Sequence, residues 1–395
     1  MIRVAVDGRV VRDTYHGIAR HTLELLRVLH GEAVELVVFQ GTGPDRRLSL
    51  RELAGEPGVE LVPFQAPPAS LAEQRHWPAL LRAVSADVLF VPYHLATPWW
   101  SPIPVVTVIH DCIFEADPAF APSGWMRHAY RAVTRMAITR ATTVATVSEA
   151  TRADLRRHYG LSLPPGNVVR HGVNPAFGRP CPPERVAEAR DRLSLPGRYV
   201  LHVGVRRPHK NQTVLLRAFA QLARAQPDLG LVLVGGPDER FPDPVPGLVD
   251  ELGLGDRVRL LSSLPEELLV PVYREASAVA FPSYIEGFGL PALEAMAAGV
   301  PVVASTTPAV GEVTEGAAVL VSPDDTDGWA AALGRVLCDR GLADGLRARG
   351  HEVVSRHTWD AAGARTRQLL ERVVAGTPSP SDGNRRRGVR WHARA

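Results

Sequence analysis

Two glutamates and two glycines are the residues of this sequence whose types and spacing most directly suggest chemistry. Glu286 and Glu294 stand eight positions apart in the stretch YIEGFGLPALEAMAAGVPVVAS, residues 284–305. Gly287 and Gly289 lie between them and carry no Cβ, so the backbone can approach a ligand closely there. A ligand bound at this stretch would meet main-chain groups and two carboxylates.

The same stretch has the pattern of a loop, a helix, a glycine stop and a strand. Pro291 suits the first helical turn, and Gly299 suits the left-handed residue after the last turn. The N-terminus of such a helix presents free N–H groups and the positive end of the helix dipole, which together favour a phosphate. Because carboxylates repel phosphate, we expect Glu286 and Glu294 to accept hydrogen bonds from hydroxyl groups, which sugars and riboses offer. The plainer alternative is a capped helix with two solvated glutamates.

A single lysine is the next feature. Lysine and arginine together number 45, and all of them except Lys210 are arginine. An ammonium group is a compact point charge that a planar guanidinium does not replace. A phosphate-binding role would therefore explain why a lysine is kept in VGVRRPHKNQT, residues 203–213; the alternative is chance survival in an arginine-biased sequence. Arg206 and Arg207 lie close enough in sequence to add a second cation.

Short β-branched runs alternate with helical patterns along the chain and would position these residues. The expected strands of the first half are residues 2–7, 34–39, 59–62, 87–94, 104–111, 142–148 and 167–173, with helical patterns at 17–30 and 148–160. Those of the second half are residues 199–204, 231–236, 258–261, 277–283, 301–305 and 318–323. This alternation indicates an α/β protein with two Rossmann-like domains, each a doubly wound parallel sheet covered on both faces.

Ligands of doubly wound sheets bind outside the carboxyl ends of the strands. His110 and Asp111 end one expected strand, and Lys210 and Glu286 each follow another. The candidate residues therefore fall where this architecture binds ligands. The sequence has no G-x-G-x-x-G fingerprint, which argues against a dinucleotide oxidoreductase.

A proline-rich segment separates the two series and sets the expected domain boundaries. We expect an N-terminal Rossmann-like domain at 1–178, a linker at 179–198 and a C-terminal Rossmann-like domain at 199–357. A helix at 358–375 and a disordered basic tail at 376–395 follow.

Composition and charge exclude several classes of protein. Hydrophobic residues make up 45% and charged residues 22% of the chain, as in soluble globular proteins. The last twenty residues hold five arginines and one aspartate, a net of +4, while the whole chain carries +3, so the remaining residues carry about −1. The body is close to neutral, so we expect no nucleic-acid partner.

The cysteines indicate the compartment. Cys112, Cys181 and Cys338 are far apart and have no metal-type spacing, which indicates a reducing compartment and no disulfide framework. We expect a cytoplasmic protein. The basic segment 123–140 is either a core-facing helix with solvated arginines or a peripheral contact with the inner face of an anionic membrane.

The stretch EGFGLPALEAMAAGVPVVAS resembles the Glu-x7-Glu signature of the retaining GT-B glycosyltransferases of family 4. Further resemblances follow in the family's order and cover almost the whole chain. They are DGRVVRDTYHGIARHTLELLRVL, TVIHD, TVSEATRADLRRHYG, VVRHGVNPAF, LHVGVRRPHKN, LSSLPEELLVPVYREASAVAFPS, PAVGEV and HTWDAAGARTRQLL. The resemblance implies the GT-B architecture: two Rossmann-like domains facing a central cleft, the first binding the acceptor and the second the nucleotide sugar. The helix at 358–375 would cross back to the first domain.

The resemblance also implies roles at the phosphate-binding stretch. Glu286 would contact hydroxyl groups of the donor sugar, and Glu294 would contact the nucleotide ribose. The backbone of Phe288, Gly289 and Leu290 would hold the diphosphate.

Other segments would complete the site. Lys210 would neutralise the leaving phosphate, His110 would reach the transferred sugar, and Gly17 would lie close to that sugar. The base would lie near Ser262 and Leu264, mostly against backbone.

The second phosphate cation departs from the family pattern. Members commonly have arginine immediately before the lysine or just after the preceding glycine, where this sequence has His209 and Val205. We favour Arg206 over Arg207 as the replacement, and either could instead be an ordinary loop arginine.

We expect neither a metal nor a cofactor. The Asp-x-Asp within DDTD, residues 324–327, precedes a helical pattern and suits an N-cap with an acidic first turn. Lys210 and the helix N-terminus would stabilise the charge that a metal ion stabilises elsewhere.

The expected function is transfer of a hexose-type sugar, mannose among the options, from a UDP- or GDP-linked donor to a hydroxyl acceptor. The acceptor could be a glycan, a lipid-linked sugar or a small metabolite. Retention of configuration rests on the resemblance alone. Two alternatives stay open: a GT-B hydrolase or epimerase of the nucleotide sugar itself, and a degenerate subunit that binds the nucleotide sugar without turnover.

Overall fold

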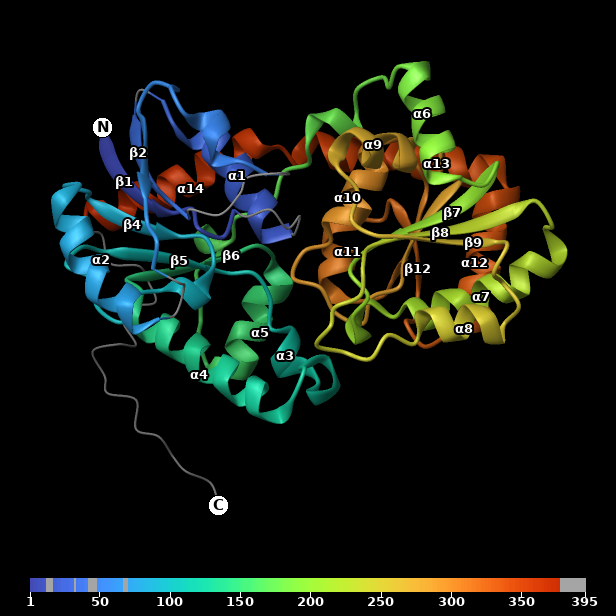
Figure 1. The fold of residues 1–395 in the computed structure, drawn as a ribbon, viewed down its shortest axis with the longest axis horizontal. Helices are drawn as coiled ribbons and strands as arrows, with labels where there is room; N and C mark the ends of the chain where they lie inside the picture. Colours follow the sequence, from blue (N-terminus) through green and yellow to red (C-terminus); the bar gives the residue numbers. More distant parts are fainter. Residues whose placement is uncertain (12–16, 32, 42–47, 67–69, 377–395) are drawn as a thin grey trace. The chain divides into compact units, whose positions relative to one another are not determined.

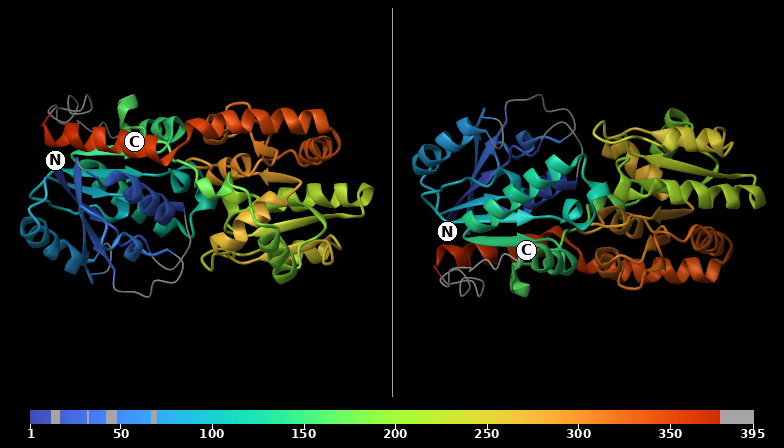
Figure 2. Two further views of the ribbon diagram at one scale, coloured as in Figure 1. Left: turned by 90° about the horizontal axis from the view of Figure 1, so that it is seen from above. Right: turned by 90° about the horizontal axis from the view of Figure 1, so that it is seen from below.

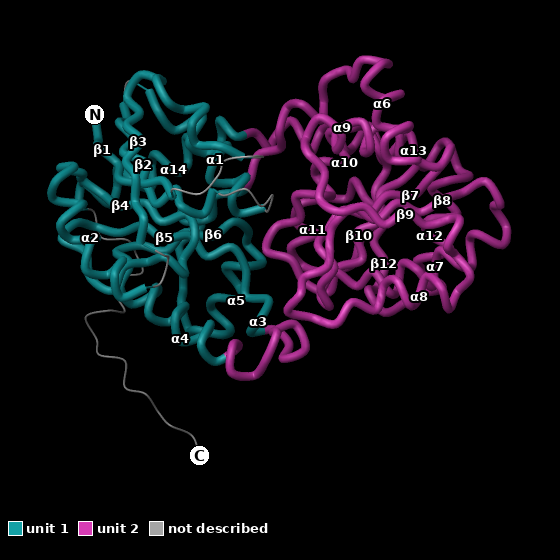
Figure 3. The backbone as a smooth tube through the Cα atoms, viewed as in Figure 1, with its two compact units in different colours: residues 1–115, 128–170, 359–395 teal, residues 116–127, 171–358 magenta. Residues whose placement is uncertain are grey.

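The computed structural model describes residues 1–11, 17–31, 33–41, 48–66 and 70–376. They divide into two compact units that alternate along the chain (Figure 3). Unit 1 comprises Met1–Glu115, His128–Arg170 and the described part of Trp359–Ala395, and unit 2 comprises Ala116–Arg127 and His171–Thr358. The predicted tail at 376–395 lies outside the described residues except for Gly376.

Unit 1 is built on a six-stranded parallel sheet with strand order β3-β2-β1-β4-β5-β6 (Figure 1). Its strands are β1 (Ile2–Asp7), β2 (Val34–Gln40), β3 (Val59–Pro63), β4 (Val88–Val91), β5 (Val105–Ile109) and β6 (Thr143–Thr146). Every residue of β4, β5 and β6 is buried, as expected for a sheet covered on both faces. The chain runs outward from β1 to β3 and then reverses through β4, so the switch point lies between β1 and β4.

The strand order of unit 1 determines on which face of the sheet its helices lie. They are α1 (Gly17–Leu29), α2 (Leu71–Ala83), α3 (Ile113–Ala116), α4 (Gly124–Arg140), α5 (Glu149–Tyr159) and α14 (Trp359–Val374), with short 3₁₀ turns η1 (Leu50–Leu53), η2 (His94–Ala96) and η4 (Pro165–Asn167). Right-handed crossovers put α1 on one face and α2 and α4 on the other, because the chain changes direction between β3 and β4. The last helix, α14, packs along α1 (Figure 2).

Aromatic side chains fill the core on the α2 side of the sheet. Trp77 of α2 makes edge contacts with Phe39 of β2 and with Phe64, at ring-centroid distances of 5.1 and 4.8 Å. Aliphatic residues of β4 and β5 complete this core. The buried stripe of α2, residues 73, 77 and 81, has the spacing of one helix face.

Unit 2 repeats the design with strand order β12-β11-β10-β7-β8-β9, all parallel. Its strands are β7 (Arg198–Val203), β8 (Leu229–Val234), β9 (Val258–Leu261), β10 (Ala278–Phe281), β11 (Val302–Ser305) and β12 (Ala318–Val321). The switch point lies between β7 and β10.

Helices cover both faces of this second sheet. They are α6 (Pro183–Leu193), α7 (Gln212–Ala225), α8 (Val245–Glu251), α9 (Glu266–Arg274), α10 (Leu290–Ala297), α11 (Pro308–Thr314), α12 (Thr326–Cys338) and α13 (Arg340–Arg356), with η3 (Pro118–Phe120), η5 (Pro175–Phe177) and η6 (Pro208–Lys210). On one face α7 packs against α12 and α8; on the other, α10 packs against α13 and α9. A hydrophobic core joins α7, α8 and α12 to the sheet.

Two sequence expectations differ from the fold. Residues 167–173 are not a strand: Val168 makes one isolated bridge with Thr146, after which the chain leaves for unit 2 at His171. The segment expected as a linker, 179–198, contains helix α6, which packs against α9 within unit 2. The sequence also gave no sign that residues 116–127 group with unit 2.

Within the described residues, no helix combines the length and the apolar character that crossing a bilayer requires.

Candidate functional site

The switch point of unit 2 brings Lys210 and Glu286 together. Lys210 ends the short turn η6 after β7, and Glu286 lies in the loop after β10. Because β7 and β10 are neighbouring parallel strands, the loops at their carboxyl ends meet. The Lys210 ammonium lies 2.6 Å from Glu286 Oε1, and both side chains are largely buried. The sequence predicted both residues as functional but did not predict this ion pair.

Contacts with other segments hold the loop after β7, residues 204–211, in place. We call this segment the lysine loop. Asn211 follows Lys210 in the left-handed region, at φ 53°, and its Nδ2 donates to the carbonyls of Pro282 and Pro323. The Lys210 ammonium also lies 5.6 Å from the centre of the Phe281 ring. These contacts hold the charge at the carboxyl ends of the central strands, with 15% of the Lys210 side chain exposed.

Helix α10 begins beside this pair, and its first turn is anchored by an aromatic cluster. Gly289 has φ 115°, a conformation that favours glycine, and directly precedes the helix. The buried Phe288 ring makes an edge contact with His171, 4.8 Å between centroids, and a tilted contact with His357. The first helical hydrogen bond runs from Ala292 N–H to Gly289 O, and the N–H of Leu290, as in the first turn of any helix, has no carbonyl partner within the helix. Phosphate binding by these groups stays a prediction.

Glu294 lies deeper than the sequence suggested. It is 5% exposed, and its Oε2 accepts a 2.9 Å hydrogen bond from the Tyr273 hydroxyl of α9. The two glutamates therefore differ: Glu286 is paired with a cation, and Glu294 is held by a phenol. The ribose-binding role of Glu294 stays a prediction.

Both arginines of the lysine loop are engaged by aspartates after β8. Arg206 Nε binds Asp243 at 2.9 Å, and its Nη1 donates to the Gly235 carbonyl. Arg207 Nε binds Asp238 at 2.6 Å. The Arg207 side chain is 33% exposed and that of Arg206 12%. The structure thus ties Arg206, which the sequence favoured as second cation, into the wall of the site, and leaves Arg207 more accessible.

His209 occupies one of the two positions where the resemblance led us to expect an arginine. Burial holds the pKa of its imidazole well below the ordinary value, and the charges of Lys210 and Arg207 act in the same direction. His209 is 2% exposed and packs edge-on against Phe120 of η3. It is therefore neutral and adds no charge for a phosphate.

Two sequence-predicted contacts for the base lie farther along the sheet. Ser262 is exposed and Leu264 is buried in the loop after β9. Strand β9 is separated from β7 by β8, so this loop is two strands away from the lysine loop. Gly287 is half-buried between Glu286 and the Phe288 anchor.

Unit 1 carries the predicted sugar-facing residues. His110 follows β5, and its Nε2 donates to the Pro92 carbonyl at 2.7 Å, which fixes its tautomer. Its ring makes an edge contact with His21 of α1, which in turn packs against Trp359 of α14. Gly17 is exposed at the first position of α1.

The loop after β1 contains a buried cluster that sequence reasoning missed. Arg9 is 1% exposed and lies between Asp7 and Glu73, binding Asp7 at 2.6 and 2.8 Å. Its guanidinium carbon lies 4.2 Å from the Phe64 ring centre and 5.3 Å from that of Trp77. Burial raises the pKa of Glu73. No motif marked Arg9, because arginine is the commonest cation in this chain.

The expected helix cap in residues 324–327 is confirmed. Asp325 is the N-cap of α12 and accepts a hydrogen bond from Gly328 N–H. Across the described residues, no group of three or more His, Cys, Asp and Glu side chains is arranged to hold a metal ion. The three cysteines are free thiols.

A small aromatic contact near the lysine loop was also missed. Phe120 stacks on Tyr284 at 5.9 Å, and the Tyr284 hydroxyl donates to Asp324. Burial, together with that carboxylate, raises the pKa of Tyr284 to about 12. Tyr284 N–H also binds the His209 carbonyl, which ties the β7 and β10 loops together.

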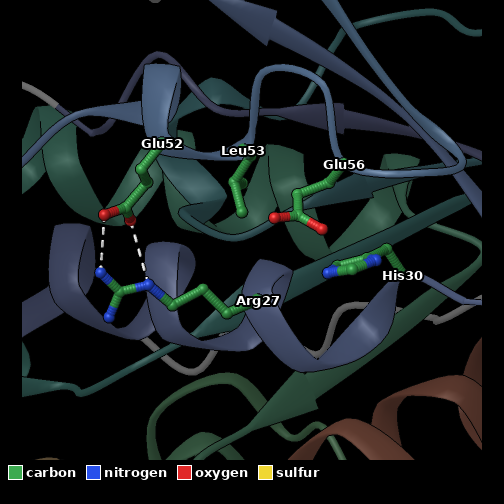
Figure 4. Close-up of a pocket in the computed structure, with 5 residues that line it drawn as sticks. All are labelled: Arg27, His30, Glu52, Leu53 and Glu56. Atoms are coloured by element: carbon green, nitrogen blue, oxygen red, sulfur yellow. Dashed lines mark hydrogen bonds and ion pairs between the residues drawn. The ribbon is translucent and has the colours of Figure 1, made fainter.

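A pocket between α1 and η1 contains none of these residues (Figure 4). It is lined by Arg27, His30, Glu52, Leu53 and Glu56, and the ion pair of Arg27 with Glu52 crosses it. Its arginine is already neutralised, so the pocket is not a candidate anion site.

Two doubly wound parallel units are the architecture of the GT-B class of protein. The family described as Glycosyltransferase Family 4 matches residues 15–177, and the family described as Glycosyl transferases group 1 matches residues 186–353. The protein is therefore a glycosyltransferase of the GT-B type.

Individual proteins agree with this assignment. D-inositol 3-phosphate glycosyltransferase of Nocardia farcinica is 38% identical over 62% of this chain and 60% of its own length. MMP alpha-(1->4)-mannosyltransferase of Mycolicibacterium hassiacum is 32% identical over 69% of this chain and 66% of its own length. The chain thus spans about two thirds or less of these two relatives. The structure of the Anabaena protein HepE with UDP and glucose matches the fold with a TM-score of 0.73 and 18% identity, covering 94% of this chain and 100% of HepE.

Proposed function

We propose that this protein is a retaining, metal-independent glycosyltransferase that moves a hexose from a nucleoside-diphosphate sugar to a hydroxyl acceptor. The observation that carries the proposal is the Lys210–Glu286 pair at the switch point of unit 2, beside the first turn of α10. One cation, one carboxylate and free main-chain N–H groups are what a sugar diphosphate requires.

Lys210 acts on the leaving group. When the bond between sugar C1 and the β-phosphate oxygen breaks, negative charge grows on the phosphate while the sugar becomes oxocarbenium-like. Lys210 and the N–H groups of Gly289 and Leu290 stabilise that charge. The bound diphosphate and Glu286 both contact the Lys210 ammonium.

Glu286 acts on the sugar. Its Oε1 binds Lys210, and its Oε2 makes no hydrogen bond to any described residue, so this oxygen accepts from a sugar hydroxyl. Glu294 accepts from the ribose, oriented by the Tyr273 hydroxyl. The sugar contact of His110 in unit 1 stays a prediction from the resemblance; its Nε2 donates to the Pro92 carbonyl.

The acceptor hydroxyl attacks C1 from the face that the phosphate leaves. Its oxygen forms the new bond to C1, and its proton passes to the departing phosphate oxygen, so charge and atoms balance. This route needs no carboxylate nucleophile and retains the anomeric configuration.

Two donors deserve the first tests. HepE was solved with UDP, which supports a UDP-hexose, and the mannosyltransferase relative supports GDP-mannose. The relative named for D-inositol 3-phosphate supports a small phosphorylated polyol as acceptor, beside a glycan or a lipid-linked sugar.

The decisive experiment measures nucleoside diphosphate release and product from each donor and acceptor, with and without EDTA. We expect transfer that survives EDTA, retains configuration, and falls about 10²–10³-fold in both Lys210→Ala and Glu286→Ala. Arg356→Ala is the matched control, because it removes another 2.6 Å ion pair of unit 2, with Glu315, and should leave activity unchanged.

Normal turnover in both variants would overturn the proposal. Release of free sugar or an epimer at the rate of transfer, with no acceptor present, would establish the hydrolase or epimerase instead. Tight nucleotide binding without turnover of any donor would establish a binding subunit.

A further inference from the structure

An aromatic and cationic surface covers α2 and the loop that follows η2 in unit 1. Three large apolar side chains are exposed there: Leu71 at 68%, Trp99 at 46% and Trp100 at 54%. Solvent-exposed tryptophans placed side by side are unusual on a soluble surface. None of the candidate site residues belongs to this surface.

Helix α2 presents one continuous outer stripe to solvent. Leu71, Arg75, Ala79 and Arg82 are exposed and recur at the spacing of one helix face. The helix has a single carboxylate, Glu73, which is fully buried and bound by Arg9. The outer stripe therefore carries positive charge only.

The adjoining loop fixes the two tryptophans against this stripe. Trp99 N–H donates to Gln74 Oε1 at 2.7 Å, and the Arg82 guanidinium lies 5.6 Å from the Trp100 ring centre. Ser101 closes the loop by donating to the Ile103 carbonyl. The sequence TPWWSPIP, residues 97–104, contains no charged residue, so nothing in the loop offsets the two arginines.

The basic segment expected from sequence, 123–140, is a weaker membrane candidate. Most of it forms α4, whose described surface has one large exposed apolar side chain, Trp125, on a part grouped with unit 2. Arg135 lies over the Tyr159 ring, and Thr134 and Ala137 face the core. Trp125 is therefore the one large exposed apolar side chain beside the arginines of this described segment, against three in the surface over α2.

We propose that the surface formed by Leu71, Arg75, Arg82, Trp99 and Trp100 docks on an anionic lipid bilayer. Tryptophan is amphipathic and settles at the level of the lipid headgroups, while Leu71 can enter the acyl boundary. The two arginines attract anionic headgroups, and no carboxylate of α2 opposes them. Charge complementarity thus selects a negative bilayer over a neutral one.

The test is co-sedimentation of the full chain with phosphatidylcholine vesicles, with and without about a third phosphatidylglycerol. We expect binding to the anionic vesicles only, weakened by added salt. The double variant Trp99→Ala/Trp100→Ala should lower the partition coefficient about tenfold. Arg75→Gln and Arg82→Gln should each lower it about fivefold.

Trp125→Ala is the matched control, since it removes an exposed tryptophan outside the surface and should leave the partition unchanged. The arginine-rich sequence after residue 376 is present in every variant, so differences report the surface alone. Thermal unfolding of each variant checks that it is folded. Unchanged binding in the double tryptophan variant, or an equal loss in Trp125→Ala, would overturn the proposal. A dimer that dissociates in the double variant, without vesicle binding by the wild type, would show that a second copy covers this face instead.

Discussion

The loops after the first strand of each sheet occupy the same place in the fold, but they differ in how deeply their cation is buried and in how many carboxylates pair with it. In unit 1, Arg9 follows β1 and is sealed between Asp7 and Glu73 under two aromatic rings. In unit 2, Lys210 follows β7, is paired with the single carboxylate of Glu286 and lies against the Phe281 ring, with 15% of its side chain exposed. The cation at one switch point is thus enclosed by the fold, while the cation at the other stays partly accessible, and we propose that it binds the donor phosphate.

The largest effect is expected from Arg9. Arg9→Met leaves two buried carboxylates without their cation, and we expect it to lower the free energy of unfolding by about 3–5 kcal/mol. Urea unfolding measures this change. The control is Arg27→Met, which removes a 40% exposed arginine from the pocket of Figure 4 and should cost at most about 1 kcal/mol. Equal losses in both variants would contradict a special role for the buried cluster.

In contrast to Arg9, replacing Lys210 should reduce activity strongly and stability only slightly. Lys210→Ala should lower kcat/KM about 10²–10³-fold, which corresponds to about 3–4 kcal/mol, with a much smaller loss of stability than Arg9→Met. Steady-state kinetics and thermal unfolding of the two variants test the pair. Because Lys210 and Glu286 act as a unit, the double variant with Glu286→Ala should be little worse than either single one. Additive losses would separate the two residues.

Buried histidines should make both units sensitive to acid, and unit 2 more so. Burial lowers the pKa of His202 to about 4 and that of His94 in unit 1 to about 3, and holds the pKa of His209 well below its ordinary value. The unfolded chain therefore takes up these protons first as the pH falls below 6.5. Stability is full above that value and is lost toward pH 4, by at most about 3 kcal/mol for His202.

Hydrogen exchange at pH 7.5 and pH 5 measures this loss in each unit separately. His202→Gln should flatten the pH dependence of unit 2, and the exposed His128→Gln should change neither unit. A pH-independent unfolding free energy across this range would contradict the prediction.

The smallest effect separates the two arginines of the lysine loop. Arg207 is more exposed and binds Asp238 through Nε only, so we expect Arg207→Ala to weaken nucleoside diphosphate binding about tenfold. Arg206→Ala should cost about 1 kcal/mol of stability with little change in binding. Calorimetric titration decides between them, and the reverse result would restore the sequence-based choice of Arg206.

The sequence predicted most strands correctly because buried parallel strands consist of short runs rich in β-branched residues. Residues 167–173 have the same composition, but the strand predicted there was wrong. The segment makes one isolated bridge, between Val168 and Thr146, and the chain then passes into unit 2 at His171. Pattern alone cannot show where a chain leaves its domain.

The sequence named individual candidate residues, whose roles stay predictions, but it did not show the contacts between them. Lys210 and Glu286 could be found from residue type and local spacing, yet their pairing depends on β10 lying beside β7. The Tyr273 bond to Glu294 and the burial of His209 depend likewise on packing between distant segments. Arg9 carried no local signal, since its role arises from Glu73 on another element.

The position of α14 in the chain determines which unit can complete its fold first during synthesis. It packs on α1, and Gly363 approaches Val28 so closely that an added Cβ would lie 2.8 Å from the valine side chain. Every strand and helix of unit 2 precedes α14 in the chain, so a ribosome releases all of unit 2 before unit 1 receives its last helix. Any nascent chain that stops before Trp359 leaves the outer side of α1 uncovered, however complete its second sheet is.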